Sequence, residues 1–270
     1  MKTLITFSAF IFFIYFSLCA ALYFFQDNFI FFPPRPDNQW YSKIKSFEYF
    51  IKTDSATLHG WKISNKNINH KASIIYFGGN AEEVSYNIED ADFYSARHLF
   101  FTNMPGFGSS TGTPSEQSFF SNALQTYDHI IEQYNLDPED VFIMGRSLGS
   151  SVATYVASKR KSKGLILITP FDSVENIAVN NYSLFPVKLL LKHKFKTEQY
   201  IDQVNAPIMF IATDNDGVIP ATNLANLYEP RAEKINLLKI NDADHGSISH
   251  KEKYFSYING FILSNSTIEN

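Results

Sequence analysis

The stretch VFIMGRSLGSS, residues 141–151, decides the fold of this chain. Its first four residues are apolar and predict a buried strand, and SSVATYVASKR, residues 150–160, predicts a helix. Between them Gly145, Ser147 and Gly149 form the pattern G-x-S-x-G, which is typical of a nucleophile elbow that exposes a serine hydroxyl. The glycines are needed because side chains there would collide across the turn. An ordinary turn with a capping serine is the alternative.

Short apolar segments alternate with helical segments along most of the chain. The predicted strands are 47–53, 56–63, 73–78, 98–103, 140–144, 164–169, 207–212 and 235–241. The first two are close enough for a hairpin, whereas helical segments separate the later ones. This alternation predicts an α/β fold with a mainly parallel, eight-stranded sheet and helices on both faces.

The clearest helix is predicted at 114–134, where apolar residues recur at helical spacing. Thr113 as the cap, Pro114 in the first turn and Glu116 three residues after the cap form a start signal.

An elbow serine needs a base, because a free hydroxyl is a weak nucleophile at neutral pH. In folds with this elbow the chain order is serine, acid, histidine. Three histidines follow Ser147. His193, in LLKHKFK, is expected to make solvated or phosphate-like contacts, and His250 is expected at the surface, where the last helix starts. His245 follows strand 235–241 in INDADHGSI and is the predicted base.

The acid is expected after the strand PIMFIA, in TDNDGVIP, where Asp214 and Asp216 are both present. Asp216 is the better candidate because Gly217-Val218-Ile219-Pro220 follows it directly and the proline opens the next helix. Its role would be to orient His245 and to stabilise the imidazolium formed on attack. Asp214 is expected to be a turn or solvated residue.

The aspartates on either side of the histidine in sequence, Asp242 and Asp244, are expected only to shape their loop.

Two backbone N–H groups are candidates for an oxyanion hole. One belongs to Leu148, the residue after the serine, and the other to the loop after strand 73–78, YFGGNAEE. Gly78 and Gly79 let that backbone approach a substrate, and Asn80 is the predicted donor.

Composition excludes several classes of function. The 270 residues carry a net charge of −4, without a Lys/Arg run, which argues against a nucleic-acid partner. No zinc-type Cys/His spacing occurs, and the chemistry outlined above requires neither a metal nor an organic cofactor. The single cysteine, Cys19, cannot form an internal disulfide.

The N-terminus is the largest compositional outlier. Residues 3–25 contain no charge, and as a helix they would be about 34 Å long, enough to cross a hydrocarbon core of about 30 Å. We predict a single-pass anchor at 1–25 that crosses a membrane, with the remaining chain on either side of it. A cleaved signal peptide is the alternative, since Cys19-Ala20-Ala21 resembles a cleavage site.

Residues 26–46 form an aromatic and proline-rich juxtamembrane segment. Its Phe29-Ile30-Phe31-Phe32 run is expected either at a membrane interface or packed on the first strands. At the other end of the chain, the tail SNSTIEN, residues 264–270, is expected to be frayed.

With these pieces in order, the chain resembles the membrane-anchored α/β-hydrolases of the bud-emergence-protein (Bem-like) type and the related α/β-hydrolase-domain (ABHD) proteins. The resemblance runs from about residue 22 to 262. It includes YFFQDNFIFFP, IIYFGGNAE, NMPGFGSSTGTPSE, GRSLGSSVA, TPFDSVENIA, APIMFIATDNDGVIP and INDADHGSI. It implies an α/β-hydrolase fold with Ser147, Asp216 and His245 as a catalytic triad.

The chain departs from that family at three places. Gly78 stands where a histidine usually opens the oxyanion loop, Met104-Pro105 stands where Tyr-Arg is usual, and Thr213 stands where a glycine often precedes the acid. The second change removes a polar anchor under the active-site loop. None of the three removes a catalytic side chain.

Residues 171–206 fall where this fold accepts cap insertions, so a small helical cap is expected within a hydrolase domain at 47–264. Asp172 is expected to cap a helix there, with Glu175 in its first turn. Leu189-Leu190-Leu191 is expected either to line an acyl channel or to join the core.

The resulting hypothesis is a serine hydrolase that cleaves acyl esters or thioesters through an acyl-enzyme. The anchor and the resemblance favour lipids or acylated proteins as substrates. An aminopeptidase-like or general small-ester hydrolase is the second interpretation, and a non-catalytic scaffold on this fold is the third.

Overall fold

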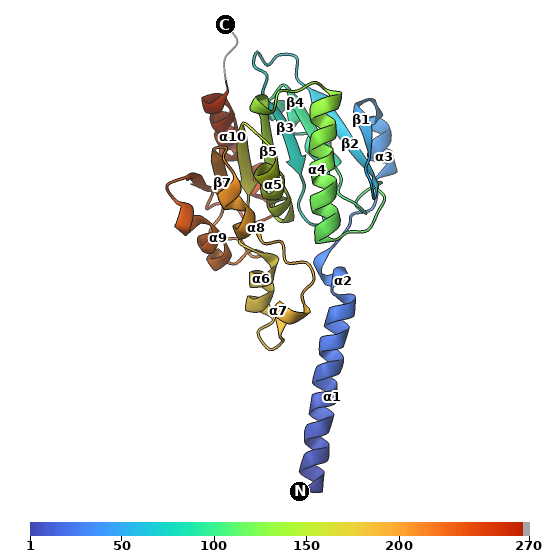
Figure 1. The fold of residues 1–270 in the computed structure, drawn as a ribbon. Coiled ribbons are helices and arrows are strands. Elements are labelled where there is room, and N and C mark those ends of the chain that lie inside the picture. Colours follow the sequence, from blue (N-terminus) through green and yellow to red (C-terminus); the bar gives the residue numbers. More distant parts are fainter. Residues whose placement is uncertain (267–270) are drawn as a thin grey trace.

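The computed structural model describes residues 1–266 and contains an eight-stranded sheet (Figure 1). The strands are β1 (Glu48–Lys52), β2 (Thr57–Ser64), β3 (Ser73–Phe77), β4 (His98–Thr102), β5 (Val141–Arg146), β6 (Gly164–Ile168), β7 (Ile208–Ala212) and β8 (Ile235–Lys239). Their order is β1-β2-β4-β3-β5-β6-β7-β8. β2 runs antiparallel to both of its neighbours, and all other neighbouring strands are parallel.

The helices are α1 (Lys2–Phe25), α2 (Asp27–Ile30), α3 (Asn38–Lys43), α4 (Glu116–Gln133), α5 (Leu148–Lys159), α6 (Val174–Asn181), α7 (Val187–Leu190), α8 (Thr197–Tyr200), α9 (Ala221–Tyr228) and α10 (Glu252–Asn265). Short 3-10 turns are η1 (Lys45–Phe47), η2 (Val84–Ile88), η3 (Ala91–Phe93), η4 (Pro138–Asp140), η5 (Ile201–Gln203), η6 (Glu229–Arg231) and η7 (Ile248–His250).

The sheet separates two hydrophobic cores. On one face α4, α5 and α9 contribute buried residues such as Phe119, Val152 and Leu227. On the other face α3, α10 and the turns η2 and η3 contribute residues such as Tyr41 and Tyr254. Because both faces are covered, every residue of β3, β6 and β7 is buried, and these strands appear in the sequence as continuous apolar runs.

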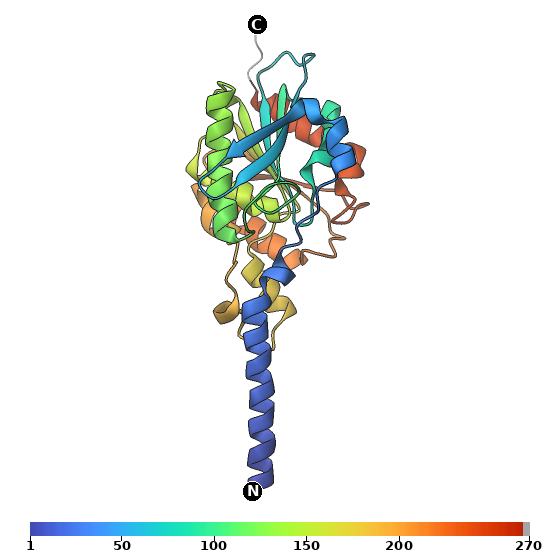
Figure 2. The same cartoon turned by 90° about the vertical axis from the view of Figure 1, so that its right-hand side faces the viewer.

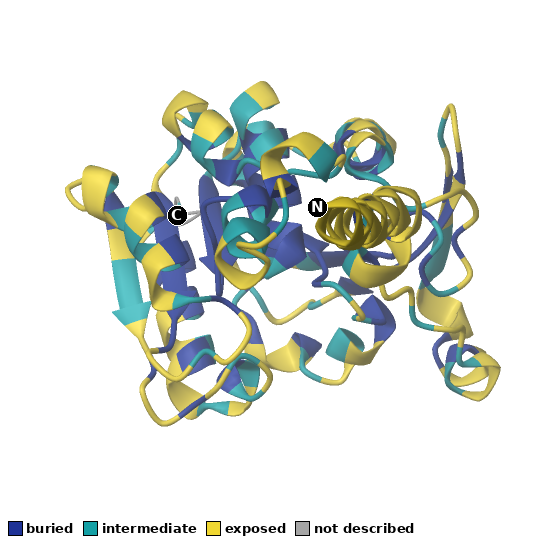
Figure 3. Ribbon diagram, turned by 90° about the horizontal axis from the view of Figure 1, so that it is seen from below, coloured by how far each residue is buried: buried dark blue, intermediate teal, exposed yellow. Residues whose placement is uncertain are grey.

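α1 projects away from the sheet (Figures 1 and 2) and is exposed along almost its whole length (Figure 3). Helices α6, α7 and α8 form a cap between β6 and β7, and α6 and α7 lie near the end of α1 that joins the domain (Figure 1). The cap and α1 therefore meet at one end of the sheet.

The predicted α/β-hydrolase fold is confirmed, and each predicted strand differs from the observed one by at most two residues at either end. The predicted start of the helix at 114–134 is wrong. Ser115, not Thr113, caps it: the Ser115 hydroxyl accepts from the Ser118 amide, and the Ser118 hydroxyl accepts from the Ser115 amide.

At the C-terminus, α10 continues to Asn265. The fraying expected for the tail 264–270 lies in part outside the described residues.

Candidate active site

Ser147 occupies the turn between β5 and α5. Its φ of 50° and ψ of −120° are values that residues with a side chain rarely adopt. Its amide donates to the Ile168 carbonyl at 2.8 Å, which ties the turn to β6. A Cβ at Gly145 would lie 2.2 Å from the Gly149 carbonyl oxygen, and a Cβ at Gly149 would lie 2.1 Å from the Phe77 carbonyl oxygen. Only glycine fits at both positions, which explains their spacing.

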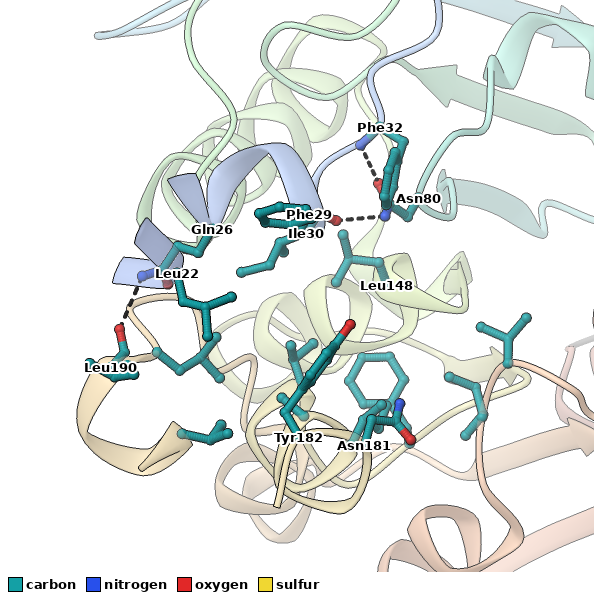
Figure 4. A pocket seen from close by; sticks show the side chains of 18 of the residues that line it. Leu22, Gln26, Phe29, Ile30, Phe32, Asn80, Leu148, Asn181, Tyr182 and Leu190 are labelled. Atoms are coloured by element: carbon teal, nitrogen blue, oxygen red, sulfur yellow. Dashed lines mark hydrogen bonds between the residues drawn. The ribbon is translucent and has the colours of Figure 1, made fainter. Parts of the chain in front are cut away.

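The loop after β3 packs against this turn. A Cβ at Gly79 would lie 3.4 Å from the Arg146 carbonyl oxygen and 3.5 Å from the Ser147 Cβ. Asn80 and Leu148 both line the cavity that contains Ser147 (Figure 4). Leu148 is the first residue of α5, so its N–H has no acceptor within the helix. The loop and the helix start thus place both candidate donor residues in the lining of the cavity that contains Ser147.

The loops after β7 and β8 bring an acid and a base to the serine. His245 Nε2 lies 3.1 Å from Ser147 Oγ, and His245 Nδ1 lies 2.8 Å from Asp216 Oδ2. The other carboxylate oxygen of Asp216 accepts from the amides of Val218 at 2.9 Å and Ile219 at 2.7 Å. The three side chains singled out in the sequence therefore form a continuous hydroxyl–imidazole–carboxylate chain.

The other acids near His245 have different partners. Asp214 pairs with Lys239 at 2.6 Å, and Asp242 pairs with Lys251 at 3.1 Å. The Asp244 carboxylate accepts from the amides at 246 and 247 and so shapes the loop.

The environment of Asp216 keeps it ionised. Burial alone would raise the pKa of its carboxyl, but hydrogen bonds from His245, Ile219 and Val218 lower that pKa below its ordinary value of 3.8. Asp216 therefore stabilises the fold fully above the unfolded-state pKa, and this contribution is lost as the pH falls through the lower folded-state pKa.

The difference in unfolding free energy between the wild type and Asp216→Asn is thus expected to shrink as the pH is lowered from about 5 to about 3. Chemical denaturation across this range measures it. A difference that stays constant or grows would contradict the assignment.

Arg146, the residue before the serine, was not singled out in the sequence. One of its guanidinium nitrogens, Nη2, donates to the carbonyl oxygens of His245 at 3.0 Å and Gly246 at 3.1 Å. Burial acts to lower the pKa of Arg146, but the nearby Glu82 carboxylate raises it overall. Glu82 also accepts from the amide of Gly79 at 2.6 Å. Arg146 therefore lies between the loop after β3 and the histidine loop, and it holds the backbone that carries the imidazole.

Arg146→Gln is expected to reduce kcat by about 10- to 100-fold with a smaller change in KM, because the imidazole loses its fixed position. Arg160→Gln is the matched control, since Arg160 pairs with Asp128 outside the cavity lining. Steady-state kinetics on a soluble ester measures both variants. An equal loss in both, or a loss confined to KM, would rule out this positioning role.

The first departure from the family pattern has a steric explanation. A Cβ at Gly78 would lie only 2.4 Å from a methyl carbon of Val84, so the space for a larger side chain is filled. The loop is instead held by Glu82, whose carboxylate accepts from the hydroxyl of Tyr76 at 2.7 Å and from the side-chain amide of Asn87 at 2.8 Å.

A polar anchor also replaces the one expected at Met104-Pro105. The buried Glu83 carboxylate accepts from the Tyr41 hydroxyl and from the Asn103 side-chain amide, both at 2.7 Å. The Asn103 side-chain oxygen accepts from the amide of Val84 at 3.3 Å. The support under the active-site loop thus comes from other residues.

Ser147 opens into a cavity of about 430 Å³, a volume typical of small-molecule sites. The end of the N-terminal helix lies on one side and the cap on the other (Figure 4). Leu190 and Leu191 line the cavity, as the acyl-channel alternative expected, whereas Leu189 is 81% exposed. No charged side chain belongs to the lining that the described residues form.

Asp172 holds the start of the cap. Its fully buried carboxylate accepts from the side-chain amides of Asn223 at 2.6 Å, Asn176 at 2.8 Å and Asn226 at 2.9 Å, as well as from the amide of Ser173. The expectation that Asp172 caps the helix is wrong, because the Ser173 hydroxyl accepts from the Asn176 amide and caps α6. The carboxylate instead joins the cap to α9.

Asp172→Ala is expected to lower the free energy of unfolding by about 3 kcal/mol, because it leaves the buried Ser173 amide and the buried Asn223 side-chain amide without this acceptor. Asp214→Ala, which removes an exposed ion pair, should cost no more than about 1 kcal/mol. Urea denaturation of both variants measures the difference, and similar values for both would contradict this account.

The C-terminal end of α1 and the residues after it are joined to the domain by specific polar contacts. The buried Gln26 side chain donates to the Leu190 carbonyl at 3.0 Å and accepts from the Lys192 amide at 2.7 Å. The Asn80 side chain donates to the Ile30 carbonyl at 2.6 Å and accepts from the Phe32 amide at 3.0 Å (Figure 4). The loop after β3 is therefore tied directly to the segment that follows α1.

His193 belongs to the same joint. Its ring contacts Asp27 at 3.0 Å and accepts from the Glu116 amide at 3.2 Å, and its side chain is only 12% exposed, so the expectation of solvated contacts is wrong. Phe31 is buried against the rings of His193 and Phe119, whereas Phe29 is largely exposed. The predicted aromatic run is therefore divided between the core and the surface. His250 is exposed, as expected.

Comparisons with known proteins agree with this fold. A family model described as "Alpha/beta hydrolase domain" matches residues 111–257, more than half of the chain, and the chain belongs to that family. An uncharacterized protein of Mycobacterium tuberculosis, Rv2307c, is 29% identical over 182 residues, which cover 67% of this chain and 65% of that protein. The chain thus spans just under two thirds of that relative's length.

Two further similarities are informative. The uncharacterized membrane protein YNL320W of Saccharomyces cerevisiae is 25% identical over 81% of this chain and 79% of its own. Among solved structures, the Pyrococcus furiosus esterase Pf2001 superposes with a TM-score of 0.67 at 16% identity, over 86% of this chain and 98% of that one. At this identity the superposition shows that the fold is shared.

Proposed function

We propose that this chain is a membrane-anchored serine hydrolase that cleaves carboxylic esters or thioesters of lipid or acylated substrates. The observation that carries the proposal is the chain Ser147–His245–Asp216, with contacts of 3.1 and 2.8 Å, beside an apolar cavity. A hydroxyl within reach of an imidazole that a carboxylate orients is the arrangement used for acyl transfer on several unrelated folds.

In the proposed reaction, Ser147 Oγ attacks the acyl carbonyl carbon while His245 Nε2 takes the hydroxyl proton. The N–H groups of Leu148 and Asn80 hold the resulting oxyanion. The intermediate collapses when the bond to the leaving group breaks, and His245 gives its proton to the departing alcohol or thiol. Water, deprotonated by His245, then attacks the acyl carbon; the bond to Ser147 Oγ breaks, His245 returns the proton to Oγ, and the carboxylic acid is released. Asp216 stabilises the imidazolium in both half-reactions.

The cavity lining supports an acyl substrate over a peptide. An aminopeptidase must bind a substrate ammonium group, which calls for a carboxylate in the site. Apart from Ser147, the polar side chains in the described lining are neutral amides and one tyrosine: Gln26, Asn80, Asn181 and Tyr182. An apolar chain with a single ester group matches such a surface better.

The length and composition of α1 support its proposed role as a membrane anchor. It is 24 residues long, has a mean hydropathy of 2.2 over its most apolar window, and is the one helix among the described residues that is long and apolar enough to span a membrane. A signal sequence passes the same test. Cleavage after Ala21 would leave Leu22 and Gln26 in the protein, but it would remove Tyr15, whose ring stacks on Phe185 and whose hydroxyl donates to the Leu184 carbonyl of the cap. This favours retention of the helix.

A substrate panel tests the proposal. Wild-type protein is expected to hydrolyse long-chain monoacylglycerol and long-chain acyl thioesters faster than an acetyl ester, and to leave peptide amides intact. Ser147→Ala should be inactive on all of them. Preference for short esters would favour a general esterase, cleavage of peptide amides a peptidase, and no turnover by folded wild-type protein a non-catalytic scaffold.

A further inference from the structure

The tip of the cap, residues 182–190, carries an unusual apolar surface. Leu184 is 83% exposed, Leu189 is 81% exposed and Tyr182 is 54% exposed. An exposed cluster of large apolar side chains on a domain indicates a contact with another apolar phase, either a protein surface or a membrane. The contacts of this cap tip with α1 identify that phase.

The cap tip packs on the middle of the anchor helix. The rings of Phe185 and Tyr15 are stacked, with centroids 5.9 Å apart and planes 6° apart. The Tyr15 hydroxyl donates to the Leu184 carbonyl at 3.1 Å. Tyr15 lies ten residues before Phe25, where α1 ends, or about 15 Å along the helix axis. The cap tip therefore extends past the C-terminal end of α1 toward the middle of that helix (Figures 1 and 2).

The level of Tyr15 and the cap tip lies within the hydrocarbon core if α1 spans a bilayer. A helix of 24 residues is about 36 Å long, only slightly longer than a hydrocarbon core of about 30 Å. A residue near its middle therefore cannot be at the surface, and a tyrosine hydroxyl at that depth needs a partner within the protein. The Leu184 carbonyl is that partner.

Polar contacts near the C-terminal end of α1 mark the level expected for the lipid headgroups. The Lys192 ammonium lies 4.4 Å from the centre of the Tyr23 ring. Just beyond, Gln26 binds the chain at 190 and 192, and Asp27 contacts His193. The cap thus runs from lysine and amide contacts beside the end of α1 to leucine and phenylalanine beside its middle. The exposed Lys188 lies between, and its long side chain can extend toward the headgroups.

The Ser147 cavity lies between the C-terminal end of α1 and the cap. Leu22, Phe29 and Ile30 line it from the anchor side, and Ile177 and Tyr182 line it from the cap side (Figure 4). Phe29 and Tyr182 are themselves largely exposed, so the cavity lining reaches the protein surface between α1 and the cap. If α1 spans a bilayer, a ligand entering there passes between two apolar walls that lie in lipid.

We propose that the cap tip is inserted in the bilayer beside α1, and that the acyl chain of an ester-containing bilayer lipid enters the cavity sideways from the hydrocarbon layer. Its ester group then lies near the headgroup level, where Ser147 is placed to attack it. The second half of this proposal rests on the proposed hydrolase function, whereas insertion of the cap tip does not.

Depth-dependent fluorescence quenching tests the insertion. The single native cysteine is removed as Cys19→Ala, and the full chain in phosphatidylcholine vesicles is labelled at Leu184→Cys or Leu189→Cys with an environment-sensitive dye. Phe12→Cys on α1 is the positive reference, and Leu263→Cys, exposed on α10 at the opposite end of the molecule, is the negative one (Figure 1). Lipids brominated along the acyl chain are expected to quench the labels at 184, 189 and 12, and not the label at 263.

A kinetic comparison tests the lateral route. The double variant Leu184→Glu/Leu189→Glu is expected to lower the ratio of turnover of a vesicle-embedded long-chain ester to turnover of a soluble acetyl ester by at least about tenfold. Leu263→Glu should leave the ratio unchanged. An unchanged ratio in the double variant would overturn the lateral route.

The two measurements separate the possible failures. Labels at 184 and 189 that behave like the label at 263 overturn the insertion, even if both esters are hydrolysed. Quenched labels without turnover of either ester keep the insertion and reject the hydrolase function. An unquenched label at position 12 rejects the anchor and the insertion together.

Discussion

Ser147→Ala is expected to reduce kcat for ester hydrolysis by about 10⁴- to 10⁶-fold while the protein stays folded. The reason is geometric: the Ser147 hydroxyl is the group within 3.1 Å of the imidazole that can form an acyl-enzyme. Hydrolysis by the variant would then depend on water and the oxyanion donors alone. Turnover with a purified long-chain ester, together with a thermal unfolding curve, measures both properties.

Ser151→Ala provides the matched control. Ser151 lies in the first turns of α5, is fully buried, and its hydroxyl has no hydrogen-bond partner among the described residues. This variant should keep its activity within a few-fold of the wild type. If both serine variants lose activity equally, the effect belongs to the helix and not to a nucleophile.

Asp216→Asn is expected to reduce kcat by about 10⁴-fold. One carboxylate oxygen of Asp216 accepts from the amides of Val218 and Ile219, so the asparagine oxygen must take that place. Its NH₂ group then faces Nδ1 of His245 and donates to it. The imidazole proton is consequently held on Nε2, the atom that should accept the proton of Ser147. The variant therefore keeps the geometry of the site but holds His245 in the wrong tautomer.

The control for this substitution is Asp214→Asn, two residues away. Asp214 pairs with Lys239 and is half exposed, so its loss should change kcat by less than about twofold. Rates measured over a range of pH complete the comparison. A wild-type rate in Asp216→Asn at any pH would show that the carboxylate does not set the tautomer.

Much of the fold could be predicted because its signals are local. The central strands are covered on both faces and therefore appear as short apolar runs, which is why VFIM and PIMFIA were assigned correctly. The elbow is equally local, since the clashes that demand Gly145 and Gly149 arise within the turn and the adjacent β3 loop. The order of strands then brings the loops carrying Asn80, Asp216 and His245 to one edge of the sheet.

The polar contacts that support the site could not be predicted in this way. Arg146 reaches the chain 99 residues further on, and Gln26 reaches a carbonyl 164 residues away. Such pairings depend on how whole elements pack, and a single arginine or glutamine in the sequence carries no signal of its distant partner. The role of Asp172 is hidden for the same reason, because its amide partners at 223 and 226 come from α9. The cap tip beside Tyr15 likewise appears only in three dimensions.

The most direct test of the central claim is to locate the adduct of a long-chain fluorophosphonate by peptide mass spectrometry. Wild-type protein is expected to carry one adduct, on Ser147, whose formation is slowed severely in His245→Ala and in Asp216→Asn. An adduct on another residue, or labelling of Ser147 at the wild-type rate without His245, would contradict the account.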